Sequence, residues 1–373
     1  MIMWDDAKIK DFQETLLTWY DSEKRDLPWR RDHEPYHIWV SEIMLQQTQV
    51  NTVIPYYERF MDWFPTVESF ASAPEERILK AWEGLGYYSR VRNMQKAAKQ
   101  VVQDYAGQWP QTANELQNLV GIGPYTAGAI ASIAFNEVGP AVDGNAFRVF
   151  SRLFEIEDDI AKPQTRVIFE QVIQQVISKE RPGDFNQAIM DLGSSYMTAK
   201  NPDPEHSPVK RFNQAYLDGK ELEFPVKSKK PRPVEMAYAA LVIETDEGFL
   251  FEKRSSKGML ANLLAFPLLR VDDLKEKADD ELLTDELVIK LDQWSQENLN
   301  QPLVFSPLEG QMVKHTFTHQ KWLIDLFVVK TKAFDLSYFP GEFILEKDFD
   351  QIAVPKVQQK IWDRYLSLSS NKF

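Results

Sequence analysis

Apolar residues recur at three- and four-residue spacing through most of the first 220 residues. Phe12, Leu16 and Tyr20 mark an amphipathic first helix, and the apolar positions between 38 and 57 mark a second helical run. Residues 27–30 are expected to form a loop. Further helices are expected at residues 75–83, 90–105, 113–119, 124–135, 146–154, 165–177 and 184–192. Strand signals are scarce here, so this part is predicted to be all-α.

After residue 224 the helical spacing gives way to alternation. Residues 225–234 are rich in proline, lysine and arginine, which is typical of a stiff, extended linker. The expected elements that follow are a hairpin of strands 237–244 and 248–253, a second strand pair 313–318 and 321–330, two acidic helices within 272–297, and a closing helix 354–367. The pattern therefore predicts an all-α domain over 1–224 and an α+β domain over 235–373.

The composition excludes several classes of protein. Hydrophobic residues make up 43% and charged residues 27%, as in globular proteins. No apolar run reaches the roughly 18 residues that a membrane span needs, and the first 14 residues carry four acidic ones, so a cytoplasmic protein without a membrane partner is expected. There are no cysteines, which excludes disulfides, thiol nucleophiles and cysteine-ligated metal centres, and the five histidines form no zinc pattern.

The net charge of −13 argues mildly against a nucleic-acid partner, but binding depends on where the cations gather. Lysines and arginines are interleaved with Trp82, Tyr87 and Tyr88 between residues 77 and 99. Such a mixture can contact phosphates and stack on bases. It is equally consistent with a solvated helix face.

A glycine-rich turn precedes the helix expected at 124–135. Gly121 and Gly123 flank one apolar residue, and Pro124 suits the first position of a helix. The start of this helix has no acidic residue, so its free N–H groups suit a phosphate. The alternative is an ordinary elbow between two packed helices.

Glu42 lies beside an apolar helical stripe, and four uncharged amide and hydroxyl side chains follow it at residues 46–49. This is an unusual surface for a solvated helix. It suits a pocket that reads hydrogen-bonding edges, although Glu42 alone is also compatible with an ordinary helix acid.

Four segments together resemble one known family. They are residues 39–50, 84–90, 119–127 and 142–148, and their order and spacing are similar to those of the adenine DNA glycosylases in the helix-hairpin-helix glycosylase superfamily. The resemblance implies a helix-hairpin-helix catalytic domain followed by a Nudix-like α+β domain. The related endonuclease III family has a lysine nucleophile where this chain has Tyr125, so a glycosylase that does not cut the strand is implied.

The resemblance also implies roles for individual residues. Glu42 would protonate the adenine ring and then activate water, while Asp143 would stabilise the oxocarbenium-like sugar or attack it. Tyr125 and Asn145 would hold this pair of carboxyl groups by hydrogen bonds. The residues implied in substrate or DNA binding are Trp29, Arg30, Gln47, Thr48, Leu85, Tyr87, Gly121, Gly123, Gln187, Phe317, Thr318 and His319.

Some of these binding residues have more specific implied roles. Gln47 and Thr48 would face the base left without its partner, and Leu85 and Tyr87 would form a wedge. Residues 315–319 would probe for 8-oxoguanine. The hydrolytic Nudix motif is absent from the sequence, so nucleotide hydrolysis is not expected. The implied partner is double-stranded DNA with adenine opposite 8-oxoguanine or guanine, and we expect a monomer.

The chain departs from the family at the iron–sulfur site. Most members hold a [4Fe–4S] cluster through four cysteines, and the aligned positions in the loop 194–214 are Met197, Pro204, Ser207 and Asn213. None of these is a usual cluster ligand, so no cluster and no other cofactor is expected. Proline stiffness and hydrogen bonds are expected to hold the loop. A structural cation at the glycine hairpin is left open, as are a strand-cutting enzyme, a non-catalytic lesion-binding protein and an inactive paralogue.

Overall fold

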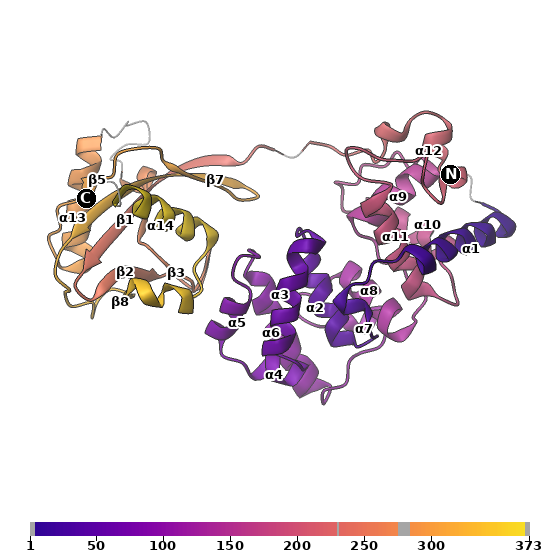
Figure 1. The fold of residues 1–373 in the computed structure, drawn as a ribbon, viewed down its shortest axis with the longest axis horizontal. Coiled ribbons are helices and arrows are strands. Elements are labelled where there is room, and N and C mark those ends of the chain that lie inside the picture. The colour runs from indigo at the N-terminus through magenta and orange to yellow at the C-terminus, as the bar shows by residue number, and fades with distance from the viewer. Residues whose placement is uncertain (1–3, 230, 275–283, 370–373) are drawn as a thin grey trace. The chain divides into compact units, whose positions relative to one another are not determined.

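The computed structural model describes residues 4–229, 231–274 and 284–369 (Figure 1). It divides into two compact units, one made of residues 1–74 and 89–230 and the other of residues 75–88 and 231–373. The sequence places residues 75–88 inside the first domain, whereas in the structure they group with the second unit. The chain therefore passes into the second unit twice.

The first unit is helical, as predicted. Its helices are α1 (Asp6–Glu23), α2 (Pro35–Leu45), α3 (Val50–Trp63), α4 (Val67–Ser72), α6 (Ser89–Asp104), α7 (Ala113–Leu116), α8 (Pro124–Phe135), α9 (Gly144–Phe154), α10 (Thr165–Val176), α11 (Pro182–Ser195) and α12 (Gln214–Leu217). Short 3₁₀ turns lie at Pro28–Arg30, Lys210–Phe212 and Glu221–Glu223, so the loop expected at 27–30 contains a 3₁₀ turn. The helix α5 (Glu75–Ala81) belongs to the second unit.

The helix α1 forms for local reasons that the sequence displays. The Asp5 side chain caps it by accepting a hydrogen bond from the Lys8 N–H at 2.8 Å. Its apolar positions Phe12, Leu16 and Tyr20 are buried in one hydrophobic cluster with residues of α9, α10 and α11. These four helices thus share a single core.

The helical run predicted from residue 38 to 57 is broken in two. The helix α2 ends at Leu45 and α3 begins at Val50, and Gln47 between them has a left-handed φ of 62°. Arg90 from α6 donates to the carbonyl groups of Ile43 and Gln46, both at 2.7 Å. The guanidinium satisfies carbonyl groups that the next helical turn would otherwise satisfy, so the helix can end there.

The second unit is an α+β domain built on one mixed sheet. Its strands are β1 (Val234–Thr245), β2 (Gly248–Lys253), β3 (Leu264–Ala265), β4 (Leu268–Arg270), β5 (Ser306–Pro307), β6 (Val313–Thr316), β7 (Gln320–Lys330) and β8 (Gly341–Ile344). The main order is β3-β2-β1-β7-β5, while β4 pairs with β1, β6 with β7 and β8 with β2. Its helices are α5, α13 (Thr284–Leu299) and α14 (Lys356–Ser369), with 3₁₀ turns at Val271–Leu274 and Glu346–Gln351.

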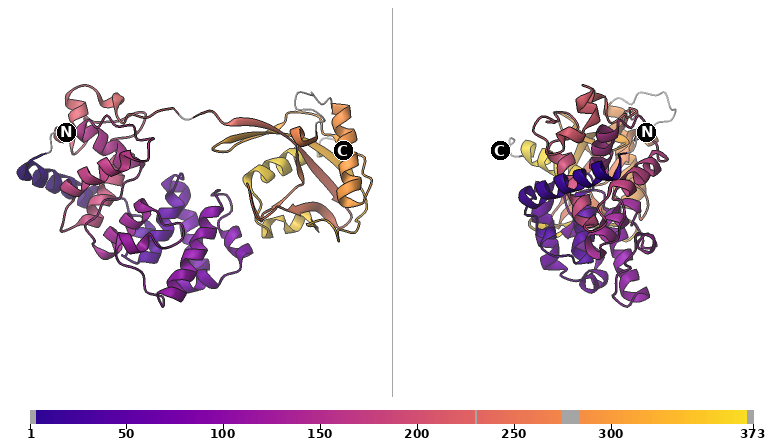
Figure 2. Two further views of the ribbon diagram at one scale, coloured as in Figure 1. Left: turned by 180° about the vertical axis from the view of Figure 1, so that it is seen from behind. Right: turned by 90° about the vertical axis from the view of Figure 1, so that its right-hand side faces the viewer.

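The strand β1 lies at the centre of this sheet and pairs in parallel with β7 along almost its whole length (Figure 2). Residues 239–243 are all fully buried. Ala240 and Val242 pack in one cluster with α14, while Leu241 and Ile243 pack in another with α13. A strand covered on both faces needs a continuous apolar run instead of alternation, and β1 has one.

The expected strand pairs are confirmed, with one difference in extent. β1 and β2 pair in antiparallel fashion only next to their turn, through Glu244 with Phe249 and Thr245 with Gly248, and β2 then pairs with β3 and β8. β6 pairs with β7 from Val313 to Thr316. Of the two acidic helices expected within 272–297, the described residues show the single helix α13 preceded by a 3₁₀ turn, and residues 275–283 lie outside the described part.

Within residues 4–229, 231–274 and 284–369, every helix is too short or too polar to cross a membrane.

Candidate active site

A cavity of about 760 Å³ opens in the first unit, where α2 and α8 meet the start of α9 and the middle and end of α11. It is lined by both carboxylic acids that the sequence singled out, Glu42 and Asp143. The other expected site residues that line it are Trp29, Arg30, Gln47, Thr48, Tyr125, Asn145 and Gln187. The volume lies within the range of pockets that hold small organic molecules.

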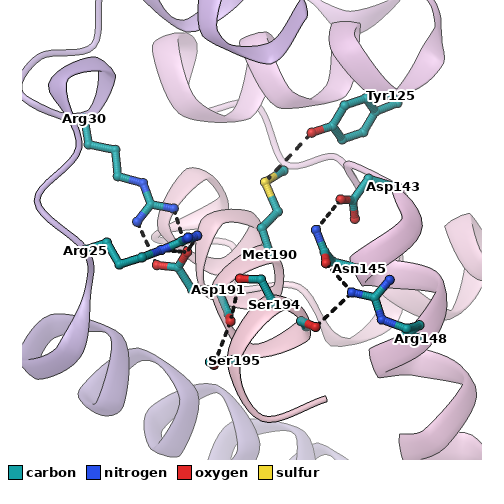
Figure 3. A network of polar contacts seen from close by, with 11 residues as sticks. Arg25, Arg30, Tyr125, Asp143, Asn145, Arg148, Met190, Asp191, Ser194 and Ser195 are labelled. Carbon is teal, nitrogen blue, oxygen red and sulfur yellow. Dashed lines mark hydrogen bonds and ion pairs between the residues drawn. The ribbon is translucent and has the colours of Figure 1, made fainter. Parts of the chain in front are cut away.

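Glu42 lies on α2 and is 5% exposed. The Tyr125 hydroxyl, on the first turn of α8, donates a hydrogen bond to Glu42 Oε2. It also lies 3.9 Å from the Met190 sulfur (Figure 3). Burial raises the pKa of Glu42 to about 7, the Tyr125 hydrogen bond lowers it and the nearby Asp143 raises it. A carboxyl group with this pKa is about half protonated at neutral pH and can give its proton to a base.

Asp143 caps the start of α9. Its Oδ1 accepts from the Ala146 N–H at 2.7 Å, and its Oδ2 accepts from the Asn145 amide at 2.6 Å. Burial raises the pKa of Asp143, whereas these hydrogen bonds and the positive charge of Arg148 lower it. Because Asp143 accepts more hydrogen bonds than Glu42, the negative charge is better stabilised on Asp143 and the proton on Glu42.

Arg148, one turn further along α9, holds Asn145 in place. Its guanidinium donates to Asn145 Oδ1 at 2.5 Å, and also to the carbonyl groups of Gly144, Gly193 and Met197 at 2.9, 2.8 and 3.1 Å. With the amide oxygen occupied by Arg148, the amide nitrogen is directed at Asp143 (Figure 3). The orientation of Asp143 therefore depends on two further side chains.

Gly193 on α11 lies against Asn145. A Cβ at this position would be 2.6 Å from the Asn145 Cβ, which is closer than two carbon atoms can approach without a shift. A glycine here lets α11 approach the start of α9 closely enough for the Gly193 carbonyl to accept from Arg148.

A second charged cluster borders the same cavity. Arg30 donates to Asp191 at 2.7 and 3.1 Å, and Arg25 also pairs with Asp191 (Figure 3). The main-chain carbonyl of Asp191 accepts from the hydroxyl groups of Ser194 and Ser195. Arg30 is thus held at the cavity wall by a buried carboxylate on α11.

The glycine hairpin has the geometry expected of a tight turn before a helix. Gly121 has a φ of 80°, and a Cβ there would meet the Asn93 side chain at 2.9 Å. Gly123 precedes α8, whose first turn has no acidic residue and no side-chain cap. Backbone N–H groups at this end are consequently available for an anion.

Five of the expected binding residues belong to the second unit and do not line the cavity: Leu85, Tyr87, Phe317, Thr318 and His319. Tyr87 is 47% exposed with a left-handed φ of 48°, whereas Leu85 is buried. Phe317 packs on the His315 and Trp322 rings, and Thr318 and His319 are exposed at the turn before β7. The exposed Tyr87, Thr318 and His319 can contact a macromolecule without rearrangement.

The loop 194–214 does not provide ligands for an iron–sulfur cluster. Met197 is buried in the hydrophobic cluster of α1, α9 and α11, and Asn213 donates to the Glu221 carboxylate at 2.9 Å and caps α12. Pro204 has no donor atom, and Ser207 is buried with a neutral hydroxyl. These four groups do not fit the thiolate ligands that such a cluster needs.

Hydrogen bonds and a buried ion pair hold this loop. Arg152 on α9 is 1% exposed and donates to the Thr198 carbonyl at 3.1 and 3.2 Å. The same guanidinium donates to the carbonyl groups of Glu221 and Phe224, and it lies 3.4 Å from the Glu221 carboxylate. Glu221 in turn accepts from Asn213, so a network of side chains crosses the loop.

The sequence did not reveal the roles of Arg25, Arg148, Met190 and Asp191. Arg148 lies three residues after Asn145, which is the spacing of neighbouring side chains on a helix, and this was the one available signal. Asp191 pairs with residues more than 160 positions away, and no local pattern indicates such a pair.

The fold and site define a DNA base-excision glycosylase of the helix-hairpin-helix superfamily. Residues 40–175 match the HhH-GPD superfamily of base excision DNA repair proteins, and residues 238–364 match the NUDIX domain. A thermostable thymine-DNA glycosylase of known structure is 26% identical, with a TM-score of 0.52, covering 57% of this chain and 98% of that one.

More particularly, the chain belongs to the adenine DNA glycosylase family. It is 34% identical to the adenine DNA glycosylase of Rattus norvegicus, over 97% of this chain and 79% of the relative. The adenine DNA glycosylase of Homo sapiens is also 34% identical, over 97% and 75%. The two-domain fold and the family expected from the sequence are confirmed.

Proposed function

We propose that this protein removes adenine from double-stranded DNA by hydrolysing its N-glycosidic bond, where the adenine lies opposite 8-oxoguanine or guanine. The observation that carries the proposal is the presence of Glu42 and Asp143 in one cavity, where burial raises the pKa of both and hydrogen bonds from Ala146 and Asn145 oppose that rise at Asp143. Membership of the adenine DNA glycosylase family supports the choice of adenine and of DNA.

The reaction divides between the two acids. Glu42 gives its proton to the adenine ring, which makes the base a better leaving group. Cleavage of the bond to the sugar leaves positive charge on the sugar ring, and the Asp143 carboxylate stabilises it or bonds to it. Glu42, now ionised, takes a proton from the water that completes hydrolysis.

A base stacked in a duplex cannot reach this cavity, so the adenine must turn out of the helix. We infer that Trp29, Arg30 and Gln187, which line the cavity, contact the extruded base. Gln47 and Thr48 face the base left behind, and exposed Tyr87 fills the gap. Gly121 and Gly123 contact a phosphate, and residues 317–319 contact 8-oxoguanine.

The absence of an amine at Tyr125 supports a glycosylase that leaves the strand intact. Both Glu42 and Asp143 line the cavity, which supports an active enzyme over an inactive paralogue. We propose a monomer without a resident cofactor, and the cytoplasmic location stays a prediction.

The test is single-turnover incubation with a duplex that contains one adenine opposite 8-oxoguanine. Hot alkali should then cut the adenine strand, and strand cutting before alkali should be absent. Glu42→Gln should lower the rate by about 10²- to 10⁴-fold, the usual contribution of a general acid. Adenine release at equal rates by the two proteins would refute the role of Glu42, and no release by either would refute the function.

Trapping with borohydride distinguishes a strand-cutting enzyme from a glycosylase that only removes the base. A lyase forms a Schiff base that borohydride traps as a covalent protein–DNA product. We expect no such product from this chain. Tight binding of the mispaired duplex without any adenine release would instead identify a lesion-binding protein.

A further inference from the structure

The segment 75–88 connects α4 and α6 of the first unit but is built into the second. It consists of α5 and of a turn that carries Gly84, Gly86 and the exposed Tyr87. Two separate sets of hydrogen bonds attach this segment to the second unit. One lies at the end of α5 and the other at Tyr87.

The first attachment is made by Lys80 and Glu83. Their charged groups pair at 2.6 Å, and their side chains are only 24% and 17% exposed. Lys80 also donates to the Ile352 carbonyl at 2.9 Å, and Glu83 accepts from the Val354 N–H at 2.8 Å. The Gln359 amide donates to the same Glu83 oxygen at 3.4 Å. The Lys80–Glu83 pair therefore binds the main chain just before α14.

The second attachment lies at the tip of the turn. The Tyr87 hydroxyl and the Thr318 hydroxyl are 2.5 Å apart, which joins the exposed aromatic ring to the turn between β6 and β7. Between the two attachments, the buried Trp82 donates its ring N–H to the Gly86 carbonyl at 3.0 Å. The turn is thus fixed at three points in a span of eight residues.

We propose that Lys80 and Glu83 are positioning residues that make adenine removal depend on the base opposite. They hold the Tyr87 turn on the unit that carries residues 317–319, so that Tyr87 and Thr318 approach DNA as one surface. Contact of Thr318 with the opposite base then decides whether Tyr87 can enter the duplex. This inference rests on the proposed function.

The Lys80–Glu83 pair differs from an ordinary surface ion pair because each side chain also forms a hydrogen bond with the main chain. An exposed pair contributes little, because water competes for both groups. Here each group also bonds the main chain of residues 352–354, and removal of one partner leaves the other partly buried without its counter-charge. Loss of either residue should therefore release the turn.

The test compares partner-base discrimination, defined as the ratio of adenine-release rates from duplexes with 8-oxoguanine and with guanine opposite. The full chain is used as wild type, Glu83→Ala, Lys80→Met and Glu83→Gln. Glu83→Ala and Lys80→Met should each lower the ratio about fivefold or more, a typical coupling between two sites. Glu83→Gln should retain more of the ratio, because its amide oxygen can still accept from the Val354 N–H.

The matched control is Glu76→Gln, which removes an exposed charge from the same helix and should keep the wild-type ratio. Thermal melting, monitored by circular dichroism, identifies any variant that fails to fold. If Glu83→Ala fails to fold, the result for Lys80→Met decides the test. Wild-type ratios in Lys80→Met, or equal losses on both duplexes, would overturn the inference. Failure of the wild type on both duplexes would instead refute the proposed function.

Discussion

At the scale of single residues, the main feature is a buried carboxyl group whose pKa is raised above its usual value. Glu42 is buried and its pKa is raised from 4.5 to about 7. Between about pH 4.5 and pH 7, Glu42 is therefore more protonated in the folded protein than in the unfolded chain. The stability this gives is fully present below about pH 4.5 and is lost as the pH rises to 7, by roughly 3 kcal/mol at 1.36 kcal/mol per pKa unit.

Glu42→Gln should remove this dependence, because an amide does not ionise. Relative to wild type, the variant's free energy of unfolding should rise by roughly 3 kcal/mol between pH 4.5 and pH 7.5. Urea unfolding at several pH values measures the difference. If it stays constant with pH, Glu42 titrates alike in the folded and unfolded protein.

Tyr125→Phe should change the pH dependence of adenine release. The rate needs protonated Glu42, so it should fall as pH rises above about 7. The Tyr125 hydrogen bond lowers the pKa of Glu42, so its removal should shift this fall to higher pH. Single-turnover rates from pH 5.5 to 9 give the midpoint. An unmoved midpoint would show that Tyr125 does not control the Glu42 proton.

The sequence indicated the two acids and several residues of the cavity wall, but not the ion pairs behind that wall. Glu42 and Asp143 lie in local segments with distinctive neighbours, and a local pattern is what a sequence displays. Arg25 and Asp191 are brought together only by the packing of α1 on α11, and no spacing along the chain reports that contact. Side-chain contacts over long separations depend on the complete fold.

At the scale of elements, the contact between α9 and α11 sets the site. Gly193→Ala should push Asn145 away from Asp143, because the added Cβ would lie 2.6 Å from the Asn145 Cβ. A displacement of this kind costs up to about 10²-fold in rate. The measurement is the single-turnover rate of adenine release. Gly139→Ala is the control, since a Cβ there meets nothing within 4 Å.

Arg152→Met should destabilise the loop 194–214. Glu221 would be left as a buried carboxylate without its cation, at a cost of about 3 to 5 kcal/mol. Replacing both residues, as Arg152→Met with Glu221→Leu, should recover much of the loss. Urea unfolding measures both variants. Lys10→Met, in the exposed pair with Glu14, should change the free energy of unfolding by less than about 1 kcal/mol.

Elements were predicted where their causes are local. α1 shows its apolar stripe in its own sequence, whereas the strand at 237–244 was expected from alternation and β1 instead has a continuous buried run. The break between α2 and α3 depends on Arg90, which lies more than 40 residues away, so the pattern indicated one helix where two exist. The placement of 75–88 likewise depends on partners near residue 354.

At the scale of the whole molecule, the two units have separate hydrophobic cores. Phe150 is buried in the first and Leu241 in the second. We expect two unfolding transitions in calorimetry, one for each unit. Phe150→Ala should lower the free energy of unfolding of the first unit, and Leu241→Ala that of the second, each by about 2 to 5 kcal/mol. A single transition that both variants lower equally would show that the cores unfold together.

The excursion of residues 75–88 has a consequence for synthesis on the ribosome. The main-chain partner of Lys80 is the Ile352 carbonyl, which is synthesised 272 residues later. During translation the segment 75–88 is therefore made long before the main-chain groups of residues 352–354 that Lys80 and Glu83 contact, at a stage when chaperones and proteases compete for incompletely folded segments. A nascent chain halted before residue 352 would lack the partners of Lys80 and Glu83 and would hold the turn through Trp82 and Thr318.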